Sequence, residues 1–410
     1  MHKSNIYLGT LLLLQMGIFG GWTSPYIAQL TAPDSIIPMT MTEASWVVSL
    51  LNLGRLFGAI GGSLCVNYVG SKTTIFITSM PLALSWVLTV MANHVWWLYI
   101  ARLLGGIGFG MTYSCFSLYL GEIADASIRG ALVTLATSGL SLGNLVVCLM
   151  GAYLPMRTTS FVSFILCLIL MALFIWLPES PHHLVKTKQD EKAKASLLFY
   201  KPSCDANSEL AALKKFVESY DNQSFMNTLK EFKTPPIRKA MLLITVLFLY
   251  SQMCGLNNIL FYMETILRSA HVTVMDPSYV VVIVMCFGIA GSCLSTFLID
   301  KCGRKILMIS SCFGVFIALL CLGAGYQLLD HGFDPETTQI FPIMGVFIFH
   351  IAVFIGILSV PTSILSEIFP PHVKCYAACF GSIIAGVFAF ISTATYQPLI
   401  SLMTARSSTM

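Results

Sequence analysis

Charge is scarce in this chain. Of its 410 residues, 10% are Asp, Glu, Lys or Arg and 56% are hydrophobic, whereas a soluble domain devotes about a quarter of its residues to charge. The mean hydropathy is +0.79. Long uncharged runs leave no polar face for the helices of a soluble domain. This scarcity excludes a soluble α/β enzyme and predicts a protein whose main solvent is lipid.

Several missing motifs exclude further classes of protein. The chain has no nucleotide loop of the Gly-x-x-x-x-Gly-Lys type and no clustered metal ligands, so we expect neither an enzyme nor a cofactor. Lys and Arg lie in loops instead of forming a stripe with aromatic residues, which argues against nucleic acid as a partner. The 13 Cys residues fall mainly in apolar segments or beside basic loops, which indicates free thiols and not a disulfide framework.

Apolar runs long enough to cross a bilayer, about 20 residues each, occur along most of the chain. The first is too long for the apolar core of a signal peptide, so we expect it to be a retained span. The segments predict six helices, a polar stretch and then five helices, with a twelfth missing or incomplete. Their approximate ranges are 5–30, 44–69, 74–92, 95–120, 130–154, 159–177, 239–267, 278–299, 305–327, 340–366 and 374–399.

Loop charges predict the orientation. Basic residues such as Lys72 and Lys301, together with the polar stretch near 185–239, fall on one side, and the short loops on the other side are mainly acidic. The positive-inside rule therefore predicts a cytoplasmic N-terminus. The expected organisation is an N-terminal bundle over 1–180, a cytoplasmic linker with short helices over 181–238, and a C-terminal bundle over 239–410. The end of the chain, 404–410, is then expected on the outer side, as in a truncated or degenerate copy.

An internal repeat supports two related halves. Glu122 precedes Arg129 by seven residues, as Glu367 precedes Lys374, and each pair lies at the cytoplasmic end of the fourth span of its half. A Gly-x-Lys loop follows the second span of each half, at 70–72 and again at 303–305. Both motifs occur in the same order, on the same side of the membrane and after the same spans in each half. This agreement indicates a transporter built from parallel repeats.

These charged residues have two interpretations. Two bundles that rock about a central site need surface contacts that break and re-form, and charged pairs of about 1 kcal/mol suit this task. The basic residues could instead follow from the positive-inside rule alone, although that rule does not require the paired carboxylates. The first interpretation predicts a cytoplasmic gate.

Polar side chains inside the spans suggest a pocket for a sugar. Amides and hydroxyls replace the hydration of a sugar, and an aromatic ring covers its apolar face. The same residues could instead join helices by hydrogen bonds. The candidates lie on the seventh span, with two more on the fifth and tenth: Ser251, Gln252, Asn257, Asn258, Tyr262, Thr137 and Thr362.

Charges inside the bilayer are costly and indicate function. Arg102 is expected to tie helices together through carbonyls or a carboxylate. Arg55 has two open interpretations: it faces the cavity and pairs with Glu264, which implies a substrate with some anionic character, or it snorkels along a wet seam. His350 is expected to be a packed, hydrogen-bonded residue, with a proton relay as the alternative.

The chain resembles sugar porters of the major facilitator superfamily, and in particular the group of insect facilitated trehalose transporter-like proteins. The resemblance covers almost the whole sequence. The matching motifs are GWTSP at 21–25, Arg102 with its nearby glycines, Glu122 through Arg129-Gly130, PESP at 178–181, GLN at 255–257 after Gln252, DKCGRK at 300–305 and SEIFP at 366–370.

The resemblance implies an all-α fold of two six-helix pseudo-repeats that alternate access to a sugar near the bilayer midplane. It also implies gate or conformational roles for the matching motif residues. These are Glu122, Arg129, Glu179, Arg102, Asp300, Arg304, Lys305, Glu367 and Lys374.

The chain also departs from the family pattern. Asn67 and Ser71 replace an Asp and an Arg in the first-half loop, Ser251 replaces a Gln, and Thr362 replaces a Trp. No Asp or Glu occurs in the first span, where proton-coupled relatives carry one, and this favours facilitated transport. We therefore expect a plasma-membrane facilitator of trehalose or a hexose. A sugar sensor without transport and a facilitator for another small polar solute stay open as alternatives, as does the oligomeric state.

Overall fold

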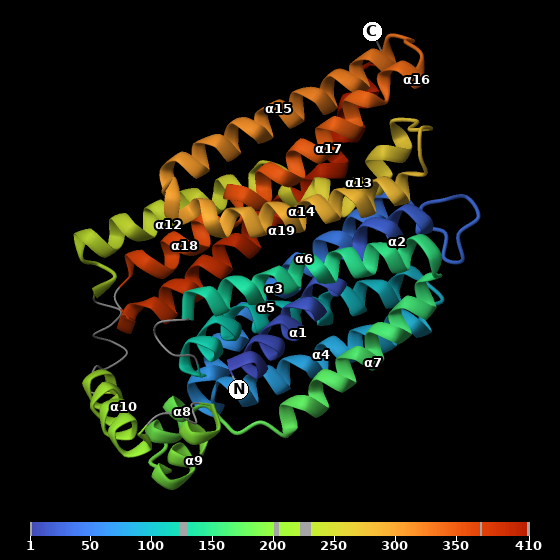
Figure 1. The fold of residues 1–410 in the computed structure, drawn as a ribbon. Helices are drawn as coiled ribbons and strands as arrows, with labels where there is room; N and C mark the ends of the chain where they lie inside the picture. The colour runs from blue at the N-terminus through green and yellow to red at the C-terminus, as the bar shows by residue number, and fades with distance from the viewer. Residues whose placement is uncertain (1, 124–128, 201–204, 222–230, 370, 408–410) are drawn as a thin grey trace.

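The computed structural model describes residues 2–123, 129–200, 205–221, 231–369 and 371–407. Throughout these ranges the regular structure is helical, with no strand. Long helices run side by side along one direction (Figure 1). The all-α fold class expected from the apolar runs is confirmed.

The first half of the chain, α1–α7, contributes long helices and one short one. Their bounds are α1 His2–Gly21, α2 Thr23–Leu30, α3 Met41–Val69, α4 Ser71–Met91, α5 Val95–Ile123, α6 Arg129–Tyr153 and α7 Met156–Ile175.

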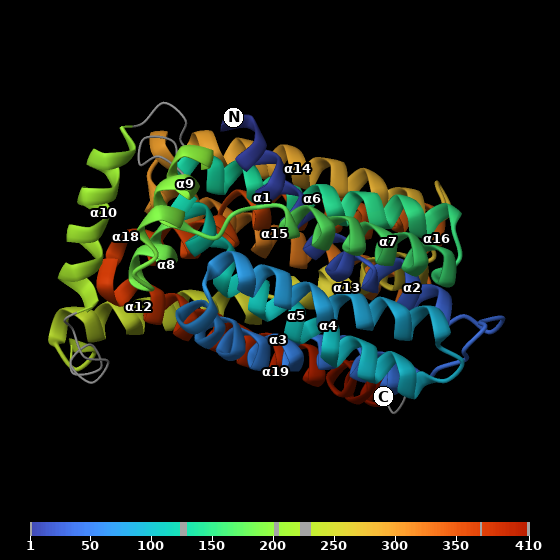
Figure 2. The same ribbon diagram turned by 90° about the horizontal axis from the view of Figure 1, so that it is seen from below.

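Among the described residues, three short helices follow, and then the second half, α12–α19. The short helices are α8 Pro181–Lys186, α9 Asp190–Tyr200 and α10 Ala206–Asp221. The second half contains α12 Pro235–Met253, α13 Leu256–Ser269, α14 Pro277–Lys301, α15 Arg304–Asp330, α16 Pro335–Thr338, α17 Ile340–Ala352, the π-helical segment η1 Val353–Ile357, α18 Ser359–Ile368 and α19 Pro371–Ser407. Helices α8–α10 gather at one end of the molecule (Figures 1 and 2).

Eight helical segments in the described ranges are long and apolar enough to cross a membrane. They cover α3, α4, α7, α12 with α13, α14, α15, the stretch from α16 through η1 into α18, and α19. The other three expected spans are helical too, as α1 with α2, as α5, and as α6, whose described part is a shorter apolar helix. The chain is a multi-pass membrane protein.

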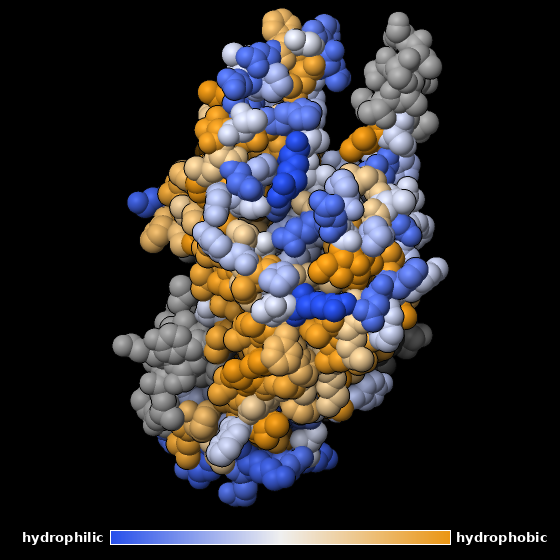
Figure 3. Space-filling model, turned by 90° about the vertical axis from the view of Figure 1, so that its right-hand side faces the viewer, coloured by the Kyte–Doolittle hydropathy of each residue, from blue (hydrophilic) through white to orange (hydrophobic). Residues whose placement is uncertain are grey.

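The two ends of the bundle differ. Helix α1 starts toward the end that carries α8–α10, and α19 finishes toward the opposite end (Figures 1 and 2). We call this opposite end the outer end, after the orientation that the loop charges predict. Figure 3 shows it with hydrophilic side chains in its upper part and a broad hydrophobic area below its middle.

Glycines let helices of the first half approach closely. A Cβ added at Gly58 of α3 would lie 2.1 Å from the Ile107 carbonyl oxygen of α5, and one at Gly17 of α1 would lie 2.1 Å from the Leu140 carbonyl oxygen of α6. Membrane helices associate largely by packing, because lipid offers no hydrophobic drive between them. Small residues along the lines of contact, or seams, between the helices therefore allow α3 to pack on α5 and α1 to pack on α6.

Three expected spans are interrupted, although each was predicted as one continuous helix. The first is interrupted at Trp22 between α1 and α2, and Pro25 follows, which has no N–H to bond the Gly21 carbonyl. The seventh breaks at Gly255, whose φ of +88° suits glycine. In the tenth, the π-helical segment η1 precedes Pro361, which leaves the Ile357 carbonyl without its usual donor.

Candidate functional site

The break in the seventh span creates a buried amide cluster. Gln252 is the last residue but one of α12, Asn257 is the second residue of α13, and Gly255 turns the chain between them. The Asn257 side-chain N–H donates to the Gln252 side-chain oxygen at 2.7 Å, and each residue is 5% exposed. The structure thus brings together the two amides that spacing had placed near one cavity. Broken helices of this kind are where transporters hold polar solutes.

Asn258 extends the amide cluster toward α19. Its side-chain N–H lies 3.2 Å from the Ser392 hydroxyl and 3.3 Å from the Ser392 carbonyl. Tyr262, one turn further along α13, stacks on Tyr396 with ring centroids 4.9 Å apart. Ser392 and Tyr396 were missed from the sequence, because nothing local in the eleventh span distinguishes them from packing residues.

Buried polar atoms near the broken helices lack partners among the described residues. They include the Asn258 side-chain oxygen and the Thr265 hydroxyl on α13, and the Trp22 indole N–H and Thr23 hydroxyl at the α1–α2 interruption. Helices α2 and α13 are neighbours, since the Glu264 backbone N–H donates to the Ser24 hydroxyl at 3.3 Å. A buried polar group without a partner costs about 1–3 kcal/mol. Such atoms are suited to bind water or the hydroxyls of a solute.

Two of the predicted pocket hydroxyls bond to their own helices. The Ser251 hydroxyl donates to the Phe248 carbonyl at 2.9 Å, and the Thr362 hydroxyl donates to the Ser359 carbonyl at 2.8 Å. Each bond lies within one helix, whereas the alternative to a pocket role was a bond between helices. The pocket role of both residues stays a prediction. The Thr137 side chain lies outside the described part of the chain.

The π-helical segment is held by hydroxyls of neighbouring helices. Ser311 of α15 donates to the Ala352 carbonyl at 2.5 Å and accepts from the Ile357 backbone N–H at 3.1 Å. Ser295 of α14 donates to the Ile355 carbonyl at 2.7 Å. Single-turn π segments occur frequently at functional sites. His350 on α17 is 3% exposed and packs on Phe354 with ring centroids 4.7 Å apart, as expected for a packed residue.

Arg102 ties helices together through a carbonyl and aromatic rings. Its guanidinium donates to the Phe19 carbonyl of α1 at 3.1 Å and lies 3.9 Å from the Trp22 ring centroid. Two partners were predicted, a carbonyl or a carboxylate, and within the described part of the chain Arg102 bonds to the carbonyl. A buried cation over a Trp face gains about 2 kcal/mol when desolvated.

The predicted pairing of Arg55 with Glu264 is wrong. The Glu264 carboxylate is 1% exposed and accepts from the Arg268 guanidinium at 2.7 Å and from the Ser278 hydroxyl at 3.0 Å. Arg268 is one helical turn away on the same helix, so it reaches Glu264 without crossing the bundle. Arg55 instead lies over the Tyr113 and Phe109 rings of α5, at 4.9 and 5.6 Å from their centroids.

In the first half, the loop before α4 is held by hydrogen bonds. Glu179 accepts from the backbone N–H groups of Lys72 at 2.9 Å and Thr73 at 3.0 Å, so its carboxylate caps the N-terminus of α4. Ser71, at the position where the family has Arg, donates to Glu122 at 2.5 Å.

Gly70 makes the turn into α4 possible. Its φ is +92°, and an added Cβ would lie 2.8 Å from the His183 ring. Burial lowers the pKa of His183, while the neighbouring Glu179 carboxylate acts in the opposite direction.

In the second half, the equivalent loop carries an ion pair. Arg304 donates to the Glu367 carboxylate at 2.7 Å and to the Ile299 carbonyl at 3.2 Å, and Lys305 is exposed. The described contacts at both loops join helices of the same half, so a gating role between the halves stays a prediction. The side chains of Arg129, Asp300 and Lys374 lie outside the described residues.

Glu367→Gln is expected to change sugar uptake by no more than about fivefold. Arg304 and Glu367 are 37% and 48% exposed, and an ion pair screened by water contributes up to about 1 kcal/mol. Initial uptake rates at low and high salt measure the effect, which should shrink as salt rises. Glu336→Gln, on an exposed residue of α16 at the outer end, is the control. A loss above a hundredfold would contradict a simple surface ion pair.

The two halves also meet toward the outer end. Ser45 of α3 donates to the Thr393 carbonyl of α19 at 3.4 Å, and Asn52, two turns further along α3, donates to the Thr393 hydroxyl at 3.3 Å. The rings of Tyr153 and Tyr279 lie 5.9 Å apart between α6 and α14. Together with the Ser24–Glu264 bond, these contacts hold the halves together at this end.

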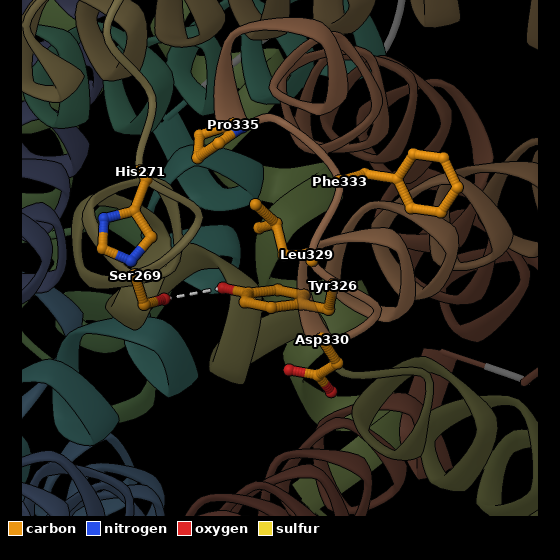
Figure 4. A pocket seen from close by; sticks show the side chains of 8 residues that line it. Ser269, His271, Tyr326, Leu329, Asp330, Phe333 and Pro335 are labelled. Atoms are coloured by element: carbon orange, nitrogen blue, oxygen red, sulfur yellow. Dashed lines mark hydrogen bonds between the residues drawn. The ribbon is translucent and has the colours of Figure 1, made fainter.

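Two hollows open near the outer end, away from the amide cluster. One, of about 440 Å³, lies between the ends of α13 and α15 and is bridged by a 2.7 Å hydrogen bond between Ser269 and Tyr326 (Figure 4). His271 and Asp330 also line it. The other, of about 290 Å³, lies on the α3–α19 seam beside Ser45. Neither hollow is lined by the predicted sugar-binding residues.

Comparisons with known proteins agree with this architecture. The chain is 28% identical to a facilitated trehalose transporter, Tret1, of Polypedilum vanderplanki, over 94% of this chain and 77% of that protein. It is 26% identical to a Tret1 of Drosophila mojavensis over 98% of this chain, but it spans about half, 47%, of that relative's length.

Solved structures show the same fold. The proton:xylose symporter XylE of the major facilitator superfamily, bound to 6-bromo-6-deoxy-D-glucose, superposes with a TM-score of 0.78 at 18% identity, covering 98% of this chain and 90% of that one. The inward-open xylose transporter XylE from E. coli gives a TM-score of 0.77 at 20% identity, covering 97% of this chain and 90% of that one. The family model described as "Sugar (and other) transporter" matches residues 12–409, and the chain therefore belongs to that family, within the major facilitator fold.

Proposed function

We propose that this protein carries a sugar, trehalose or a hexose, across a membrane by facilitated transport, and that it does not convert the sugar chemically. The observation that carries the proposal is the amide cluster at the Gly255 break, where Gln252 and Asn257 are buried and hydrogen-bonded to each other. A sugar hydroxyl can exchange for this bond, because amides both donate and accept. The names of the Tret1 and XylE relatives support the same class of solute.

The broken helices suit alternating access to this cluster. Interruptions in the first, seventh and tenth spans allow the half-helices to move separately about a fixed site. The rocking halves would close on the sugar at one end while opening at the other. The gate residues at the loops before α4 and α15 would then exchange partners between states, and Asp300, Arg129 and Lys374 belong to this part of the proposal.

Uptake into proteoliposomes tests the proposal. Labelled trehalose and glucose are supplied to liposomes that contain the full chain, with and without a proton gradient, alongside Gln252→Ala. We expect saturable uptake that is independent of the gradient and about tenfold less efficient in the variant. Absence of uptake by folded protein that still binds sugar would favour a sensor, and dependence on the gradient would favour a symporter.

The orientation is a second part of the proposal. We place the protein in the plasma membrane with the N-terminus and α8–α10 in the cytoplasm, because basic loop residues gather at that end. A maleimide reagent that does not cross membranes checks the topology on intact cells. It should label a Cys introduced at Asp34 and not one introduced at Asn207, both exposed positions.

A further inference from the structure

Arg55 points away from lipid. Phe57, Ile60 and Leu64 on the same helix are 55%, 41% and 55% exposed, and their large apolar side chains mark the lipid side of α3. At 100° per residue, Arg55 lies about 140° to 180° around the helix from each of them. The guanidinium therefore enters the bundle, and the alternative that it lies along a wet seam stays open.

Arg55 lies between two helix seams. On one side, Gly54, Gly58 and the neighbouring backbone of α3 pack directly on α5. On the other side, Asn52 bonds to Thr393, and Leu56 lies against Gly386 of α19. Helix α19 belongs to the second half, so Arg55 lies on a part of α3 that contacts both α5 and the second half.

Aromatic rings flank the guanidinium. Phe109 and Tyr113 of α5 stack with centroids 6.5 Å apart and planes at 8°, and the Arg55 guanidinium lies within 5.6 Å of both. The Phe109 ring also approaches Gly20 of α1, since a Cβ added there would meet it at 3.9 Å. The cation on α3 is thus held against two rings of α5, and α1 lies beside one of them.

The charge of Arg55 has no acidic partner among the described residues. No ion pair joins it to a carboxylate, and the Glu264 carboxylate is already bound to Arg268. The buried Nε atom of Arg55 also lacks a hydrogen-bond acceptor. Cation–π contacts stabilise the guanidinium by less than its removal from water destabilises it. The guanidinium therefore keeps the capacity to bind an anion.

We propose that Arg55 is a specificity residue that binds the carboxylate of an acidic sugar, so that the substrate class includes sugar acids. Its planar fork matches a carboxylate with two parallel hydrogen bonds, while the Phe109 and Tyr113 rings offer apolar faces to the sugar ring. This proposal rests on the proposed sugar transport and specifies the substrate for it.

Glucuronate and glucose form a matched pair of probes, because they share a ring and differ in a carboxylate against a hydroxymethyl group at C6. Dissociation constants are measured on the purified full chain from the ligand-induced rise in unfolding temperature, at constant ionic strength. We expect glucuronate to bind at least about tenfold more tightly than glucose. Arg55→Gln should bring the ratio of the two dissociation constants to about one. Arg55→Lys should keep part of the preference for glucuronate, because Lys retains the charge without the planar fork.

Arg238→Gln is the control, since Arg238 is an exposed residue at the start of α12. Equal affinities for the two sugars in the unchanged protein, no binding of glucuronate, or a preference that survives Arg55→Gln would each overturn the proposal. If Arg55→Gln does not fold, an unchanged ratio in Arg55→Lys overturns it. Glucose uptake is measured separately, so failure of transport and failure of the Arg55 site give different results.

Discussion

Replacing Asn257 by alanine is expected to lower the efficiency of sugar uptake by about ten- to a hundredfold. The variant removes an amide that binds a hydroxyl, and it also leaves the Gln252 side-chain oxygen without its 2.7 Å donor. Loss of such a buried hydrogen bond costs about 1–3 kcal/mol, which corresponds to this range. Initial rates of uptake into proteoliposomes, over a range of sugar concentrations, measure the effect.

A double-mutant cycle sharpens this prediction. Gln252→Ala alone should lower the efficiency of sugar uptake by about tenfold. The double variant should have an uptake efficiency no lower than that of Asn257→Ala, because the two amides act as a unit. Thr245→Val is the control, since the Thr245 hydroxyl bonds to the Met241 carbonyl of its own helix. Full additivity of the two losses would show that the amides act independently. Unchanged uptake in both single variants would place the sugar elsewhere.

Gly58→Val is expected to destabilise the protein far more than Gly61→Val. A Cβ at position 58 would lie 2.1 Å from the Ile107 carbonyl oxygen, whereas a Cβ at position 61 meets nothing within 4 Å. The two glycines lie on the same helix, so the helix propensity of Val lowers stability equally at both positions. Only at position 58 must α3 and α5 also move apart, which lowers the free energy of unfolding by about 1–3 kcal/mol or more.

The measurement is the unfolding temperature and the yield of monodisperse protein in detergent. We expect Gly58→Val to lower both and Gly61→Val to stay close to the unchanged protein. Equal behaviour of the two variants would mean that the α3–α5 seam does not need a small residue at this position.

Most of the architecture followed from the sequence. The apolar runs of the sequence predicted eleven membrane helices, and the structure contains helices over all eleven ranges. The reason is that a bilayer demands about 20 apolar residues for each span, a signal carried by composition alone. The division into two bundles and the residues of the gate stay predictions.

The candidate site was only partly predictable. Gln252 and Asn257 lie five residues apart on one chain segment, so their meeting follows from local geometry, and Gly255 permits the turn between them. The breaks near Pro25 and Pro361 were also predictable in principle, because a proline inside a helix removes a backbone hydrogen bond. They were not predicted, because the apolar runs continue through both prolines. The Arg55–Glu264 pairing failed, because opposite charge gives no information on which residues of distant helices meet.

The sequence by itself determined that this is a membrane protein of many helices with polar groups on its seventh span, because hydropathy and local spacing depend on neighbouring residues. The tertiary structure alone decided that Asn258 meets Ser392 and that Arg55 lies over Phe109 and Tyr113. Those contacts join helices that are far apart in the chain, by 134 residues for Asn258 and Ser392. They depend on which face each helix turns to its neighbours, and glycine seams such as Gly58 against Ile107 fix that face by allowing the backbones to touch.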